Sequence, residues 1–161
     1  MSQYSIKVYK QYFNFSAAHF LVFPDGTREP LHGHNYRVQV RGEALELSSD
    51  MVFDFLDIKP LVREVCDSLD HKILLPQENP NLRFECGEHS VKTVFGAEVF
   101  QFPRSDVLFL PLPNTSAERL AIFLGHQLVD LVWKRFQFQF KALEIEVEET
   151  PGQSAVHVIN L

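Results

Sequence analysis

Residues 32–42 read His-Gly-His-Asn-Tyr-Arg-Val-Gln-Val-Arg-Gly, a stretch whose odd- and even-numbered positions differ in character. From Asn35 to Arg41 the odd positions are polar, whereas the even positions of the stretch hold two histidines, a tyrosine and two valines before the final glycine. Successive side chains of a β-strand point to opposite faces of the sheet, so residues two apart share a face. The pattern therefore predicts a half-buried strand with one polar face over His32–Gly42.

A second strand precedes this one and is interrupted once. Apolar residues alternate from Ile6 to Val8 and, in the opposite parity, from Phe13 to His19. A bulge near Tyr9–Tyr12 reconciles the two parities. The segment Val22–Leu31, which contains two prolines, an aspartate and a glycine, then predicts the loop that joins an antiparallel pair.

Two amphipathic helices are expected further along the chain. The first spans Ile58–Leu69, with Asp57 as its cap and Pro60 in its first turn. The second spans Ala117–Lys134, and Thr115-Ser-Ala-Glu118 has the spacing of a capping box at its start. In both segments the apolar residues recur on one face, which predicts packing against a sheet.

The remaining strand-like segments are Val91–Phe102, Phe136–Glu149 and Ala155–Ile159. The resulting order of elements predicts an α+β fold with an antiparallel sheet and the two helices packed on one face. This order does not fit a βαβ nucleotide-binding fold, and the sequence has no glycine-rich phosphate loop. The length matches one domain, residues 1–161.

Charge and cysteine content exclude several classes of protein. The 15 Lys and Arg residues against 21 Asp and Glu residues give a net charge of −6, so we expect no nucleic-acid partner. No apolar run approaches the roughly 18 residues of a membrane helix, and the first residues lack the apolar stretch of a signal peptide, so no membrane partner is expected. Cys66 and Cys86 are too few for a disulfide framework and are interpreted as reduced thiols of a cytoplasmic protein.

The pair His32-Gly-His34 is the first candidate for chemistry. On a strand both imidazoles point to the same face and can reach one metal ion, and His19 has the parity to supply a third ligand from the neighbouring strand. Three histidines leave one coordination position open, which is typical of a catalytic zinc site. The alternative interpretation is that these histidines lie on a partly solvated sheet face and bind no metal.

Other titratable residues are weaker candidates. In Asp70-His71 the carboxylate can orient the imidazole for proton transfer, although a solvated histidine at a helix C-terminus is an equally good interpretation. Glu149 can accept paired N–H donors of a heterocycle, or it belongs to an acidic strand edge. Cys86-x-x-His89 has no partner pair, so it is interpreted as a loop and not as a metal site.

Five short segments occur in a fixed order, namely Phe15-Ser-Ala-Ala-His19, Leu31-His-Gly-His-Asn-Tyr36, Met51-Val-Phe-Asp-Phe55, Leu69-Asp-His-Lys72 and Glu149-Thr150. Together they resemble the 6-pyruvoyl-tetrahydropterin synthase / 6-carboxy-tetrahydropterin synthase family over residues 13–158, nearly the whole chain. Each segment alone is weak, whereas the combination is specific.

The resemblance implies a tunnelling fold (T-fold), in which three protomers join their sheets into a barrel and two such trimers stack as a homohexamer with active sites at the subunit interfaces. It implies that His19, His32 and His34 bind Zn²⁺, and that the ion holds the side chain of a pterin substrate, 7,8-dihydroneopterin triphosphate. Asp70 and His71 match the acid/base pair of the family.

The resemblance also implies a set of residues that bind the pterin ring. The family's glutamate anchors the amino-pyrimidine edge of the ring, and the segment before the second helix lines the pocket. The competing interpretation of Glu118, as part of the capping box, stays open. The implied pterin-binding residues are Glu149, Thr150, Ser116 and Glu118.

The sequence departs from the family pattern at the catalytic base. The synthases usually carry a cysteine four residues before His-Gly-His, whereas Arg28 holds that position here and residues 1–57 contain no cysteine. Glu29 stands three residues before His32, and this Glu-x-x-His-Gly-His pattern resembles the type III branch. That resemblance implies Glu29 as general base and cleavage of the side chain to 6-hydroxymethyl-7,8-dihydropterin, a step of folate synthesis.

Acid–base strength is consistent with such a change of reaction. A free glutamate carboxylate is a weaker base than a cysteine thiolate by about four pKa units, or about 6 kcal/mol. It is therefore poorly suited to removing a proton from carbon, as pyruvoyl formation requires. Cleavage of a carbon–carbon bond starts instead from a hydroxyl group, whose proton a bound zinc ion makes more acidic.

Alternative functions remain open at this point. The protein could form 6-pyruvoyl- or 6-carboxy-tetrahydropterin, for a biopterin or a queuosine/deazapurine pathway, with another group in place of the thiol. It could be a non-catalytic T-fold protein that binds zinc and pterin. A zinc hydrolase unrelated to pterins would leave Glu149-Thr150 unexplained. Candidates for the triphosphate site are Arg28, Lys72 and Arg104, and no motif supports them.

Overall fold

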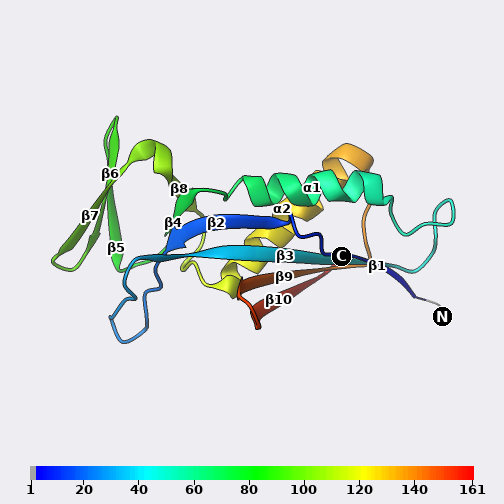
Figure 1. The fold of residues 1–161 in the computed structure, drawn as a ribbon, viewed down its shortest axis with the longest axis horizontal. Helices are drawn as coiled ribbons and strands as arrows, with labels where there is room; N and C mark the ends of the chain where they lie inside the picture. Colours follow the sequence, from blue (N-terminus) through cyan, green and yellow to red (C-terminus); the bar gives the residue numbers. More distant parts are fainter. Residues whose placement is uncertain (1–2) are drawn as a thin grey trace.

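The computed structural model describes residues 3–161 and consists of a twisted sheet with both helices on one of its faces (Figure 1). The main sheet has seven strands in the order β10-β9-β3-β2-β4-β8, and β1 pairs with β3 beside this path. The strands of the main sheet are β1 (Tyr4–Val8), β2 (Asn14–His19), β3 (His32–Ala44), β4 (Lys72–Pro76), β8 (Val107–Leu110), β9 (Ala142–Thr150) and β10 (Gln153–Asn160). A separate three-stranded sheet contains β5 (Leu82–Cys86), β6 (Ser90–Phe95) and β7 (Glu98–Pro103).

Strand β3 is the centre of the main sheet, as its alternating sequence predicts. It pairs antiparallel with β9 on one side and with both β1 and β2 on the other. The interruption predicted near Tyr9–Tyr12 is confirmed and is longer than a single bulge. Residues 9–13 pass opposite only Val38 and Gln39, because Val8 pairs with Val40 and Asn14 pairs with Arg37.

The first helix, α1 (Phe55–Asp67), starts three residues before the predicted position. Asp54, and not Asp57, is its N-cap, since the Asp54 carboxylate accepts a hydrogen bond from the backbone N–H of Leu56 at 2.7 Å. Pro60 consequently lies inside the helix. The predicted apolar face is confirmed, because it lies buried in the main core.

The second helix, α2 (Ala117–Phe136), starts where predicted and continues two residues further. Its N-cap is Ser116, whose hydroxyl accepts from the backbone N–H of Arg119. The capping box predicted to begin at Thr115 is therefore wrong by one residue, which frees the Thr115 side chain to face the histidines described below. α2 packs on β9 and β10, and α1 packs on α2 and β2.

Three strands were missed, and the predicted strands at Val91–Phe102 and Phe136–Glu149 differ most from the structure. β4 and β8 add parallel pairings to an otherwise antiparallel sheet, and β5 extends the small sheet. Val91–Phe102 is a hairpin of β6 and β7 that turns at Gly96, where φ is +57°. Strand β9 begins at Ala142 and not at Phe136; Phe140 lies in the preceding loop, buried against Gly42, where a Cβ atom would overlap its ring.

A second cluster of buried side chains lies under the three-stranded sheet, which stands at the end of the main sheet where β3 begins (Figure 1). It joins Phe20 and Val22, from the start of the β2–β3 loop, to Leu75, Leu82 and Val91. The β2–β3 loop is thus anchored on an apolar patch and does not extend freely into solvent.

Both cysteines are free thiols, which agrees with the expectation of no disulfide framework. Cys66 lies in the core, where burial raises the pKa of its thiol to about 12, whereas Cys86 is exposed on β5. Neither helix found in residues 3–161 is long and apolar enough to cross a membrane.

Candidate metal centre

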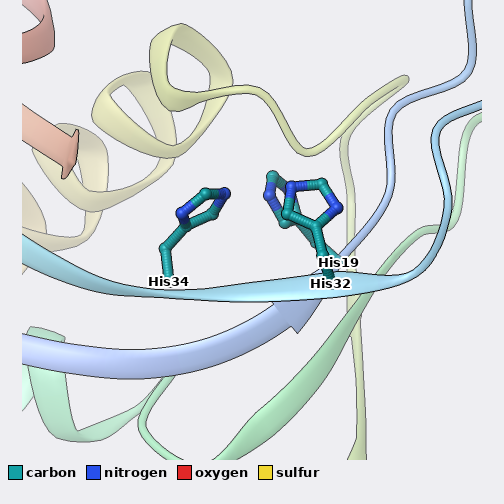
Figure 2. Close-up of side chains that lie close together, drawn as sticks. All are labelled: His19, His32 and His34. Atoms are coloured by element: carbon teal, nitrogen blue, oxygen red, sulfur yellow. The ribbon is translucent and has the colours of Figure 1, made fainter.

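Three imidazoles converge on the face of the sheet that carries the helices (Figure 2). His19 and His32 are direct partners in the β2–β3 register, and His34 follows on the same face of β3. One ring nitrogen of each residue lies within 4.8 Å of those of the other two. The convergence predicted from strand parity is therefore confirmed.

Backbone carbonyls fix the orientation of two of the rings. Nδ1 of His19 lies 3.0 Å from the carbonyl oxygen of Thr115, and Nδ1 of His32 lies 2.8 Å from that of Pro30. A carbonyl can only accept, so each Nδ1 carries the proton and each Nε2 keeps its lone pair for another partner. Nε2 of His19 accepts a hydrogen bond from the Tyr36 hydroxyl at 3.0 Å. This donor set fits a divalent metal ion with three nitrogen ligands and an open position.

Burial also keeps these groups in the protonation states that suit a metal site. His19 is fully buried; desolvation lowers its pKa, the other two histidines add to this effect, and the Thr115 carbonyl and Glu149 oppose it. His19 is therefore neutral at neutral pH, as a ligand must be. Burial, followed by the neighbouring Glu149, raises the pKa of Tyr36, so its hydroxyl remains a donor.

The lowered pKa of His19 predicts that the metal-free protein loses stability in mild acid. Below about pH 6.5 the unfolded chain binds a proton that the folded chain does not, so the free energy of unfolding falls as the pH decreases, by at most about 1.4 kcal/mol per pH unit for one group. Urea unfolding in the presence of a chelator at pH 7.5 and 5.5 measures the slope. His19→Asn should flatten it and His126→Asn should not; an equal slope in all three proteins would contradict the assignment.

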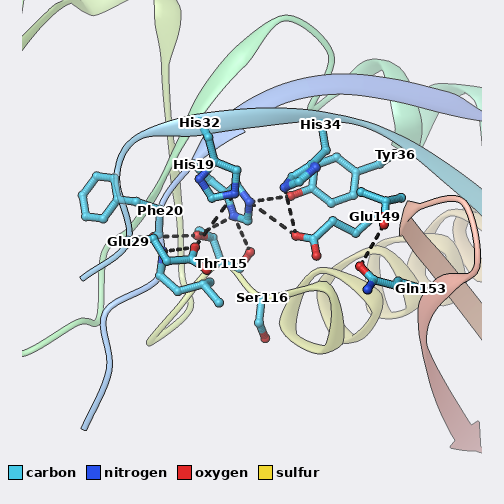
Figure 3. A network of polar contacts seen from close by, with 12 residues as sticks. His19, Phe20, Glu29, His32, His34, Tyr36, Thr115, Ser116, Glu149 and Gln153 are labelled. Carbon is cyan, nitrogen blue, oxygen red and sulfur yellow. Dashed lines mark hydrogen bonds and ion pairs between the residues drawn. The ribbon is translucent and has the colours of Figure 1, made fainter. Parts of the chain in front are cut away.

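Glu149 lies beside the histidines (Figure 3) and lines a small cavity. Its Oε1 atom is 3.4 Å from Nε2 of both His19 and His34. The cavity, of about 240 Å³, also brings in two other predicted pterin residues, Ser116 and Glu118. The full lining is Leu21, Ser116, Ala117, Glu118, Glu149, Gln153, Ser154 and Ala155.

The fourth predicted pterin residue makes a different contact. The Thr150 hydroxyl donates to Oε1 of Gln153 at 2.8 Å, and Gln153 in turn lines the cavity, so Thr150 touches the cavity through its neighbour. Ser116 also caps α2 by its hydroxyl, so the cavity wall is fixed by the start of that helix.

Glu29 lies on the other side of the three imidazoles (Figure 3). Its Oε2 atom is 3.9 Å from Nε2 of His32 and accepts the backbone N–H of Leu21 at 3.1 Å. Its own N–H donates to the carbonyl of Leu21 at 2.9 Å. The carboxylate expected beside the metal motif is thus held there by the β2–β3 loop.

Asp70 and His71 form the expected pair but are not beside the histidine triad. Nδ1 of His71 lies 2.9 Å from Oδ2 of Asp70, and Oδ1 of Asp70 accepts the backbone N–H of Ser16 at 2.7 Å. Desolvation works to raise the pKa of Asp70, but the hydrogen bonds from Ser16 and His71 outweigh it and lower the pKa below its usual value. The carboxylate is therefore ionised and orients the imidazole.

This pair faces the opposite side of the sheet. His71 lines a hollow of about 420 Å³ with Ser16, Ala18, Gly33 and Asn35, whose positions alternate with those of the three histidines. His34 also borders this hollow. No polar contact among residues 3–161 joins the pair to the three imidazoles. Within one chain the structure does not bring these groups together.

Two residues that contact His19, Tyr36 and Thr115, were not among the predicted site residues. Tyr36 could have been found, because it follows His34 by two positions on the same face. Thr115 belongs to the segment that the family resemblance assigns to the pterin pocket, but nothing local indicates its contact with His19. Of the triphosphate candidates, Arg28 pairs with Glu98 at 2.6 Å and Nζ of Lys72 donates to the carbonyl of Ser105.

Comparison with known proteins places this site in a family. A family model described as 6-pyruvoyl tetrahydropterin synthase matches residues 7–158. A Methanocaldococcus jannaschii protein with the provisional name 6-carboxy-5,6,7,8-tetrahydropterin synthase is 34% identical over 145 residues, which are 89% of this chain and 88% of that one. The Haemophilus influenzae 6-carboxy-5,6,7,8-tetrahydropterin synthase is 31% identical over 149 residues, 86% and 89% of the two chains.

The fold is shared with solved structures. The crystal structure of 6-pyruvoyl tetrahydropterin synthase from Plasmodium vivax has a TM-score of 0.93 and 30% identity, with both chains covered completely. Another structure of that protein, with a TM-score of 0.93, 29% identity and the same complete coverage, is described as a glutamate-to-alanine variant of a catalytic residue. The chain therefore belongs to the 6-pyruvoyl tetrahydropterin synthase family and is a lyase of that family.

Proposed function

We propose that this protein is a zinc-dependent lyase that acts on the side chain of 7,8-dihydroneopterin triphosphate. The observation that carries the proposal is the arrangement of three convergent imidazoles between two carboxylates, Glu29 on one side and Glu149 at a cavity on the other. In this proposal Glu149 would hold the pterin ring and Glu29 would move a proton, and the three imidazoles lie between these two carboxylates.

The cavity beside Glu149 would hold the pterin ring. A carboxylate accepts two parallel N–H donors well, and the amino-pyrimidine edge of a pterin presents such donors. Ser116 and Glu118 line the same cavity, with Thr150 one contact behind it. With the ring there, its side chain extends toward His19 and His34, from which Glu149 is 3.4 Å away.

The three imidazoles would hold the zinc ion through their unprotonated nitrogens, as the carbonyl contacts of His19 and His32 favour. A bound zinc ion acidifies a coordinated hydroxyl group and stabilises negative charge on oxygen. His34 completes the set from the same strand.

Glu29 would act as the general base. It accepts the proton of the side-chain hydroxyl on the second carbon, and the bond between the first and second carbons then breaks. The electron pair of that bond passes into the pterin ring system, and the first carbon is reprotonated, with Asp70 and His71 as the proton source. The products are 6-hydroxymethyl-7,8-dihydropterin and a two-carbon aldehyde that carries the triphosphate.

The proton source would come from a second copy of the chain. Asp70 and His71 face away from the imidazoles of their own chain, so they can complete only the site of a neighbour. We propose the homohexamer of two stacked trimers that the family resemblance implies, with each active site at a subunit interface.

A second candidate product has its own support. The names of the curated relatives specify 6-carboxytetrahydropterin synthase, and they support that product better than the cleavage product. The catalytic residue of the P. vivax relative is a glutamate, which supports an acidic base in either reaction. The carboxylate at Glu29, a weak base for a carbon-bound proton, is what favours cleavage in this chain.

The product distinguishes these candidates. The zinc-loaded protein is incubated with 7,8-dihydroneopterin triphosphate, and the pterins are identified by chromatography and mass, with chelator-treated protein as the control. We expect 6-hydroxymethyl-7,8-dihydropterin. 6-Carboxy- or 6-pyruvoyl-tetrahydropterin without the hydroxymethyl product would replace cleavage by the second candidate, and unchanged substrate that nevertheless binds would indicate a binding protein.

Zinc should stabilise the protein through the triad alone. A ligand at about 100 times its dissociation constant adds about 2.7 kcal/mol to the free energy of unfolding, so the melting temperature should rise with zinc and fall with a chelator. His34→Ala should abolish the response, whereas His126→Ala, an exposed histidine on α2, should keep it. A response that survives in His34→Ala would place the metal elsewhere.

A further inference from the structure

We propose that Arg28 is a positioning residue that holds the proposed base, Glu29, in place by fastening the β2–β3 loop to the three-stranded sheet β5–β6–β7. The inference rests on the proposed function, in which Glu29 moves the proton. It assigns a task to the residue that stands at the family's cysteine position and to a sheet that contributes no side chain to the triad.

Two hydrogen bonds connect the Arg28 guanidinium to both partners. Its Nη1–H donates to the carbonyl oxygen of Glu29 at 2.7 Å, and its Nε–H donates to Oε2 of Glu98 at 2.6 Å. Glu98 is the first residue of β7. One side chain thus links the backbone of the base to a different sheet.

Aromatic rings enclose the same guanidinium. Its central carbon lies 4.6 Å from the ring centre of Phe100, 5.6 Å from that of Phe20 and 6.0 Å from that of Phe95. Phe20 and Phe100 are themselves stacked, with centres 5.2 Å apart. The Arg28 side chain is only 17% exposed. A cation over aromatic faces is worth more when it is desolvated, so this contact is stronger than a surface ion pair.

The loop end at Glu29 is fixed at separate points. Leu21 binds both the N–H and the carboxylate of Glu29, and Val22 pairs with Arg28 in an antiparallel bridge. The first half of the loop is also held from outside, because Val22 exchanges two hydrogen bonds with the side chain of Asn114 and is buried in the cluster under the three-stranded sheet. The contacts of Arg28 with Glu98 and Phe100 join the second half of the loop, next to Glu29, to the three-stranded sheet.

The position of the base affects the rate of the chemical step, and it has little effect on how tightly the substrate binds. A displacement of about 1 Å can cost about 100-fold in the chemical step. The proposed pterin cavity lies on the other side of the histidines, at Glu149, so a loosened Glu29 leaves substrate binding unchanged. Loss of Arg28 should therefore lower kcat and leave KM and zinc content as they are.

The test compares two arginines that each pair with a glutamate of the three-stranded sheet but differ in burial. Arg28→Met removes the fastening. Arg83→Met removes an exposed arginine that pairs with Glu85 on β5 of the three-stranded sheet and makes no cation–π contact within residues 3–161. Arg28→Met should lower kcat about 10- to 100-fold and speed amide hydrogen exchange of residues 21–29 by at least about tenfold. Arg83→Met should change neither quantity.

Two milder variants keep the test valid if Arg28→Met does not fold. Phe100→Leu removes the aromatic face and Glu98→Gln removes the charge, and each should produce a smaller change of the same kind. Arg28→Lys keeps the charge but not the forked donors, so it should restore only part of kcat.

The outcomes separate this inference from the proposed function. If kcat and exchange of residues 21–29 are unchanged in Arg28→Met while Glu29→Gln is inactive, the inference is wrong and the role of Glu29 stands. A rise in KM at constant kcat would make Arg28 a substrate contact and also overturn it. If Glu29→Gln keeps full activity, the proposed base is wrong, and the exchange measurement still tests whether Arg28 holds the loop.

Discussion

Glu29→Gln should lower kcat by about 10²- to 10⁴-fold, the usual contribution of a general base, and leave the zinc content unchanged. The amide of glutamine retains an oxygen that can accept the Leu21 N–H, so the loop keeps its contact. What is lost is the ability to accept a proton beside His32, 3.9 Å from its Nε2 atom. The expected defect is therefore chemical and not structural.

Steady-state turnover of 7,8-dihydroneopterin triphosphate, with metal analysis of each protein, measures this effect. Glu85→Gln is the matched control, because Glu85 is also ion-paired but lies on β5 outside the site. If Glu29→Gln retained kcat within about twofold of the original protein, another group would be the base and the catalytic proposal would have to be rebuilt.

Local regularity explains what the sequence could predict. The β3 strand and the meeting of His19 with His32 follow from strict alternation, since one period of two fixes both the strand and the shared face. The apolar faces of α1 and α2 follow in the same way from helical spacing. The convergence of the three histidines could be predicted for the same reason, because they lie on two adjacent strands of regular pattern.

Elements without a local period were not predictable. Lys72–Pro76 and Val107–Leu110 are short apolar runs, and such runs do not distinguish a buried parallel strand from a helix or a packed loop. Phe136–Phe140 alternates as a strand does, yet Phe136 is an exposed residue at the end of α2, and Phe138 and Phe140 pack against the core from a loop. The start of α1 was misplaced because Asp54 and Asp57 are both acceptable caps.

Long-range contacts limited the prediction of the site. The pairing of Arg28 with Glu98 joins residues far apart in sequence and depends on where the small sheet docks. The same is true of Asp70-His71: adjacency in sequence predicts their ion pair, but the parallel pairing of β4 with β2 decides which face of the sheet they occupy. That face is away from the histidines, so the pair can act only in the site of a neighbouring chain.

Two inactive variants should restore each other's activity when they share one oligomer. His34→Ala disrupts the metal centre, and His71→Ala removes the proton source but leaves the metal centre intact. If each site takes its imidazoles from one chain and its Asp70-His71 pair from another, about a quarter of the sites in a randomly assembled equal mixture contain both intact parts. The mixture should therefore recover up to about a quarter of the original turnover.

The control uses two groups that the structure places together in one chain. Glu29 is 3.9 Å from Nε2 of His32 in the same chain, so a mixture of Glu29→Gln with His34→Ala should stay inactive, because no chain carries both intact groups. Co-expression of differently tagged variants, with purification of the hybrid through both tags, ensures that the chains are mixed. A hybrid of His34→Ala and His71→Ala without activity would contradict the shared site. Full turnover by His71→Ala alone would exclude this histidine from the reaction.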